Sequence, residues 1–129
     1  MSKKFKNKQA FALFQSECER WIAKYGLFDW KVSFTNEFQD DMLGSCIYSY
    51  VNHGAIFNLA PLDCWPEEMR TPKDIRYVAF HEVTELLIGD LRLLTMERNV
   101  TEEQVEAATH SLIHRLEKAF YVEQDIQAE

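Results

Sequence analysis

The sequence predicts one α+β domain over residues 1–129, with a helix first, a small sheet next and two helices last. Apolar residues recur at helical spacing near the start, short strand-like segments occupy the middle, and two helix-start signatures follow. The composition, 47% hydrophobic and 27% charged, is typical of a packed globular domain. A chain of 129 residues has room for one core.

The first helix is predicted over about residues 8–25, where apolar side chains return every three or four positions. Gly26 follows at the position where a helix commonly ends, because glycine readily adopts the left-handed conformation. The apolar positions are Phe11, Phe14, Cys18, Trp21, Ile22 and Tyr25. The helix is therefore expected to be amphipathic.

Three strands are predicted over residues 30–34, 44–51 and 55–59. Residues 52–54 (Asn-His-Gly) have turn chemistry, so the second and third strands are expected to form a hairpin. His53 is then expected to be an exposed turn residue. Together the three segments predict a small three-stranded antiparallel sheet.

Two helices are predicted after a loop over residues 61–70. Thr71 is a suitable N-cap and Pro72 suits the first helical position, so a helix is expected from there to about residue 94. Thr101 and Gln104 form a capping-box pattern, which predicts a last helix that runs to about residue 124.

The second predicted helix carries a His-Glu-x-x-Glu motif at residues 81–85. His81 and Glu85 are four residues apart, so their side chains project from one face and could hold a divalent metal ion. Glu82 lies about 100° around the helix, where it could reach a water on that ion. This is the arrangement of metallopeptidases in which a glutamate is the general base.

The helical wheel predicts that this helix is buried on nearly all sides. The neighbours of His81 and Glu85 are Tyr77, Val78 and Ile88 rather than charged residues, so both polar residues are expected to need a partner or a metal. The main apolar face comprises Ile75, Ala79, Phe80, Val83, Leu86, Leu87, Leu91 and Leu94. Without a metal, His81 and Glu85 would pair with each other or with polar groups in the core.

A third ligand is expected from the last helix, which offers His110, Glu106 and His114 in that order of preference. His110 and Glu106 lie on the flank of the apolar stripe beside Ile113, whereas His114 points almost straight outward. The stripe itself comprises Val105, Ala108, Leu112, Leu116 and Ala119.

Charge and cysteine content restrict the function classes. The net charge of −7 disfavours a nucleic-acid-binding surface. The three cysteines show no Cys-x-x-Cys spacing and are expected to be reduced thiols, as in the cytoplasm. No apolar segment predicts an export signal or a membrane span, so a cytoplasmic protein is expected.

The segments around His81-Glu82-Val83-Thr84-Glu85 and His110 resemble small metallopeptidase-like proteins, many of them encoded by phages and prophages. The order of elements is similar to that of compact zincins such as the SprT-like group. This resemblance implies an α+β zincin-like fold, an edge strand over residues 55–59 that holds peptide backbone, and a Zn²⁺ ion, or another divalent ion, bound by His81, Glu85 and His110. Zincins normally have histidine where Glu85 stands.

Two functions are therefore expected from the sequence. The first is zinc-dependent hydrolysis of a peptide or protein, with Glu82 as the catalytic base. The alternative is a non-catalytic zincin-fold interaction protein, a phage accessory or host-modulating factor with a structural metal or none. A phage-encoded chain would act in the host cytoplasm.

Overall fold

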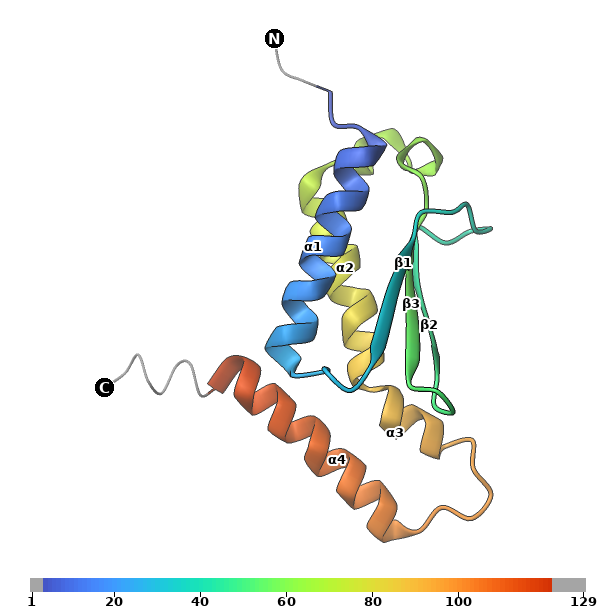
Figure 1. Cartoon of the computed structure of the whole chain (residues 1–129), viewed down its shortest axis with the longest axis vertical. Coiled ribbons are helices and arrows are strands. Elements are labelled where there is room, and N and C mark those ends of the chain that lie inside the picture. Colours follow the sequence, from blue (N-terminus) through green and yellow to red (C-terminus); the bar gives the residue numbers. More distant parts are fainter. Residues whose placement is uncertain (1–3, 122–129) are drawn as a thin grey trace, which may run out of the picture.

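The computed structural model describes residues 4–121 and has a three-stranded sheet with two long helices against one face (Figure 1). The predicted α+β class and the order of elements are confirmed. The elements are α1 (Asn7–Tyr25), β1 (Lys31–Thr35), β2 (Gly44–Ser49), β3 (Gly54–Leu59), α2 (Pro72–Leu87), α3 (Gly89–Leu94) and α4 (Glu102–Leu116). Two 3₁₀ turns (Leu62–Cys64 and Glu67–Met69) precede α2, and a π-helical turn (Glu117–Tyr121) extends α4.

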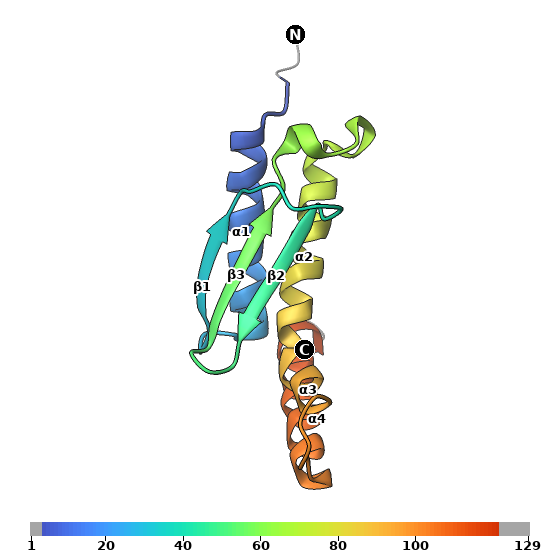
Figure 2. The ribbon, with the colours of Figure 1, turned by 90° about the vertical axis from the view of Figure 1, so that its right-hand side faces the viewer.

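The sheet is mixed, which corrects the prediction of an antiparallel sheet. Its strand order is β1-β3-β2, with β3 parallel to β1 and antiparallel to β2. The predicted hairpin of β2 and β3 is present, but β3 lies between the other two strands (Figure 2). The prediction that residues 55–59 form an edge strand is therefore wrong, and β2 is the edge strand beside α2.

The buried Asn58 side chain helps to hold β1 parallel to β3. Its side-chain oxygen accepts hydrogen bonds from the Thr35 hydroxyl (2.6 Å) and the Glu37 backbone N–H (2.9 Å). Its side-chain nitrogen donates to the Glu37 carbonyl (2.8 Å). One buried amide thus holds the chain where it leaves β1 and crosses the end of β3. In the sequence, Asn58 is a polar residue within an otherwise apolar strand.

Helices α1 and α2 pack against each other and cover the inner face of the sheet (Figure 1). The core lies between these helices and the inward side chains of the strands. Its largest members are Trp65, Tyr25, Phe14, Phe57, Leu59, Ile75 and Leu86. The predicted apolar faces of both helices are confirmed, since Phe14, Cys18, Ala79 and Val83 are fully buried.

The helix predicted from residue 71 to about residue 94 is two helices. Ile88 has φ −89° and ψ 1°, so α2 ends at Leu87 and α3 starts at Gly89. Gly89 lies against the Tyr48 ring, where an added Cβ would be 3.2 Å from the ring carbons. The predicted start of the last helix at Thr101 is confirmed by both hydrogen bonds of the capping box. The predicted end near residue 124 lies outside the described residues.

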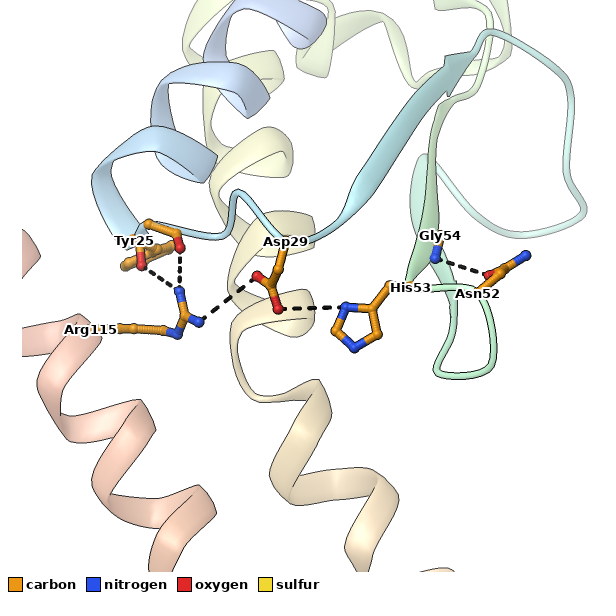
Figure 3. A network of polar contacts seen from close by, with 7 residues as sticks. Tyr25, Asp29, Asn52, His53, Gly54 and Arg115 are labelled. Carbon is orange, nitrogen blue, oxygen red and sulfur yellow. Dashed lines mark hydrogen bonds and ion pairs between the residues drawn. The ribbon is translucent and has the colours of Figure 1, made fainter.

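A series of polar contacts connects α4 to the rest of the molecule (Figure 3). The Arg115 guanidinium donates to the carbonyls of Tyr25 (3.1 Å) and Gly26, at the end of α1. Its other terminal nitrogen lies 3.9 Å from Asp29 Oδ1, and Asp29 Oδ2 lies 3.5 Å from His53 Nδ1. These contacts fix one end of α4 beside the end of α1.

His53 is half-buried, which corrects its expected place as an exposed turn residue. Its ring stacks on Trp30 with the centroids 4.4 Å apart. The residue has a left-handed backbone (φ 52°), which the tight turn between β2 and β3 requires. Among the described residues, no helix is long and apolar enough to cross a membrane.

Candidate metal centre

Helix α2 and edge strand β2 approach closely because β2 begins with a glycine. A Cβ added at Gly44 would overlap Val78 Cγ1 and would lie 3.6 Å from Glu82 Oε2. Val78 and Glu82 are four residues apart, so one face of α2 lies against the start of β2. Glycine at position 44 therefore leaves the space that Val78 occupies, and so lets the face of α2 that carries Glu82 approach β2. This role of Gly44 was not evident from the sequence.

Glu82 is the buried carboxylate of this contact, with 7% of its surface exposed. Within residues 4–121, its side chain has neither a hydrogen bond nor an ion pair. Burial and the nearby Glu85 carboxylate raise the pKa of Glu82 to about 7, against a smaller lowering by His81. A carboxyl group with this pKa can both accept and release a proton near neutral pH, as a general base must.

His81 and Glu85 form the predicted pair on adjacent turns of α2. His81 Nε2 lies 3.4 Å from Glu85 Oε1. Two ligands of a tetrahedral zinc ion, each about 2.0–2.1 Å from the metal, are separated by about 3.3–3.4 Å. The two donor atoms therefore already have a spacing that a single zinc ion could bridge.

The predicted burial of this pair is wrong, since the His81 side chain is 53% exposed and the Glu85 side chain 39%. Tyr77 and Ile88 beside them are also exposed. The helical wheel showed apolar residues on this side of α2, but the described residues leave it open to solvent. Of His81, Glu82 and Glu85, Glu82 alone is buried, and it lies toward β2.

The three candidates for the third ligand lie on α4, away from the pair. His110 and His114 line a hollow with Tyr25 and Gly26, and His114 Nδ1 lies 3.7 Å from Glu117 Oε1. Glu106 is exposed. Within residues 4–121, no three His, Cys, Asp or Glu side chains lie together as a metal site. The structure thus assembles two of the three predicted ligands, and His110 as the third stays a prediction.

A hollow of about 350 Å³ opens beside Glu82 and His81, at the start of edge strand β2. Its walls come from three segments: the loop before β2, the loop before α2, and α2 itself. The residues that line it include Asp41, Met42, Met69, Asp74 and Val78. Sequence reasoning missed this hollow because its walls are distant in the chain.

Two of the three cysteines, Cys18 and Cys46, are poor candidates for a nucleophile. All three are free, as predicted. Burial raises the pKa of the Cys18 thiol strongly and that of Cys46 to about 12, and the nearby Glu82 carboxylate adds to both effects. Both side chains therefore remain protonated thiols at neutral pH.

No protein-family model, no curated protein and no solved structure matches this chain significantly.

Proposed function

We propose that this chain is a zinc-dependent hydrolase of the zincin kind that acts on a peptide or protein. The main support is Glu82, an unpartnered carboxylate that is 7% exposed and opens into a hollow beside a sheet edge. Its neighbours His81 and Glu85 present donor atoms 3.4 Å apart. A buried carboxylate without a partner is costly to a fold, so its presence beside the hollow favours a chemical role.

In this proposal His81 and Glu85 would hold a zinc ion, which would supply Lewis-acid chemistry for the hydrolysis. Glu82 takes a proton from the attacking water and then gives it to the leaving amine. Its pKa of about 7 suits both steps. His110 would complete the ligand set only if α4 moved toward α2, and solvent would otherwise occupy that position.

Edge strand β2 offers a place for the substrate backbone. Within residues 4–121 it pairs with β3 alone, so alternate residues of β2 direct N–H and C=O groups away from the sheet. An extended peptide could add to this edge by main-chain hydrogen bonds and pass the hollow beside Glu82.

The decisive measurement is the zinc content of tag-free protein after zinc loading and dialysis. We expect about one equivalent in the parent chain and a loss of zinc in His81→Ala and in Glu85→Ala. His110→Ala and its matched control His114→Ala report on the third ligand. Loss of zinc in His110→Ala but not in His114→Ala would mean that α4 moves toward α2 and that His110 binds the ion. Failure of the folded parent chain to take up zinc would refute the proposal.

Turnover is then tested with Glu82→Gln on a peptide mixture. The proposal expects this variant to keep its zinc and lose hydrolysis. The alternative, a non-catalytic interaction protein, is favoured by the exposed apolar side chains of α4, among them Val105, Ile113 and Leu116. An interaction protein would keep its binding in Glu82→Gln and lose it when these side chains are replaced.

A further inference from the structure

The hollow beside Glu82 has an acidic character that the proposed reaction does not require. We call it the acidic hollow and define it by Asp41, Met42, Met69, Asp74, Val78 and Glu82. Asp41 and Asp74 come from different segments, the loop before β2 and the first turn of α2. Among its described lining residues there is no lysine or arginine. Besides its carboxylates the hollow presents one imidazole, that of His81.

Glu82 is the buried carboxylate of the acidic hollow. The side chain is 7% exposed and has no hydrogen bond or ion pair within residues 4–121, yet it lines the hollow. A buried carboxylate is stabilised when a cation approaches it or when it takes up a proton. The Thr71 hydroxyl donates to Asp74 Oδ2 (2.5 Å), which leaves Asp74 Oδ1, among the described residues, free to accept a hydrogen bond from a ligand.

The remaining walls are apolar and adaptable. Met42 is exposed, and Met69 and Val78 are half-buried. Unbranched methionine side chains adjust to the shape of a ligand, and apolar walls suit the methylene stem of a long side chain. The volume of about 350 Å³ is ample for one such side chain.

We propose that the acidic hollow selects a lysine or arginine side chain from an extended peptide bound along β2. The stem would lie against Met42, Met69 and Val78, and the cationic end would meet the Asp41 and Asp74 carboxylates, which leaves Glu82 to the proposed reaction. Gly44 both begins β2 and lines the hollow, so a peptide on this edge passes its mouth. The net charge of −7 also favours a basic partner. The inference rests on the proposed function for the path of the peptide, and it names the substrate class.

Peptide binding tests this selection apart from catalysis. The probe is a fluorescein-labelled strand-forming peptide of threonine and valine with one central guest residue. The guest is lysine, arginine, norleucine or glutamate; norleucine keeps the stem of lysine without its charge. Fluorescence anisotropy is measured with zinc-free parent protein in a chelator, so a chain that neither binds zinc nor hydrolyses peptides can still show the selection.

We expect the lysine and arginine peptides to bind about tenfold more tightly than the norleucine peptide, and the glutamate peptide to bind most weakly. Asp41→Asn and Asp74→Asn should each reduce this preference. Asp63→Asn makes the same substitution at an exposed aspartate outside the hollow and should leave the lysine preference unchanged. Unfolding midpoints of all variants check that each one folds.

Equal affinity for the lysine and norleucine peptides would overturn the inference. Failure of all four peptides to bind would overturn it as well. A preference that responds equally to Asp63→Asn and Asp74→Asn would reflect net charge rather than the hollow, and it would overturn the inference as well. Hydrolysis without lysine preference would retain the proposed function and reject only this selection.

Discussion

Helices α2 and α4 carry similar sequence patterns but have different surroundings. Each is amphipathic and capped by a threonine, and each has a pair of potential metal ligands four residues apart, His81 with Glu85 and His110 with His114. In α2 the apolar face is buried against α1 and the sheet, whereas no residue of α4 between Glu102 and Leu116 is buried.

The difference teaches that spacing on a helix brings donor atoms together but does not by itself place a buried carboxylate beside them. Beside the pair in α2 lies Glu82, whose pKa is raised to about 7 because β2 and the core exclude water from it. The pair in α4 has no buried carboxylate next to it and faces an open hollow. The neighbouring element, rather than the motif, makes the α2 site chemically distinctive.

The largest expected contrast is in stability. Leu86 in α2 is 1% exposed and Leu116 in α4 is 38% exposed. Leu86→Ala leaves a cavity in the core and should lower the free energy of unfolding by about 2–5 kcal/mol. Leu116→Ala should lower it by about 1 kcal/mol or less. Urea unfolding measures both, and equal losses would mean that α4 is packed as tightly as α2.

The second contrast is in how the stability of the metal-free protein depends on pH. The pKa of Glu82 is about 7 in the folded protein and 4.5 as a reference, so the folded state binds more protons between these values. The contribution of Glu82 to stability is therefore greatest below pH 4.5 and falls as the pH rises to about 7, by on the order of 3 kcal/mol in total.

Glu82→Gln removes this titration, so the variant should be more stable than the parent chain at pH 8 and gain little at pH 4. Glu106→Gln on the exposed surface of α4 is the matched control and should follow the parent at both values. Urea unfolding across this pH range, with a chelator present, measures the difference. Parallel curves for the parent and Glu82→Gln would show that Glu82 ionises normally.

The smallest effect is expected at the contact that holds α4. Arg115→Gln removes the hydrogen bonds to the Tyr25 and Gly26 carbonyls and the weak ion pair with Asp29, at a cost of about 1–2 kcal/mol. Hydrogen exchange should then accelerate at the amides of α4 but not at those of α2. Arg98→Gln, an exposed residue outside this network, is the control. Unchanged exchange in α4 would show that apolar contacts alone hold this helix.

Local sequence patterns predicted most of the secondary structure. The periodicity and caps of α1, α2 and α4 and the hairpin turn at residues 52–54 all depend on residues near one another in the chain. The pairing of β1 with β3 was not predictable in this way, because it joins distant segments. There Asn58 accepts hydrogen bonds from Thr35 and Glu37 and donates one to Glu37.

The sequence by itself determined the α+β class, the spacing of His81 and Glu85 on one helix, and the presence of Glu82 between them. Only the tertiary structure decided that Glu82 is buried while His81 is exposed, that β2 rather than β3 lies at an edge of the sheet, and that His110 lies on a separate surface. The physical reason is that helix geometry is local, whereas burial and the pKa of a carboxyl group depend on which distant segments exclude water from it.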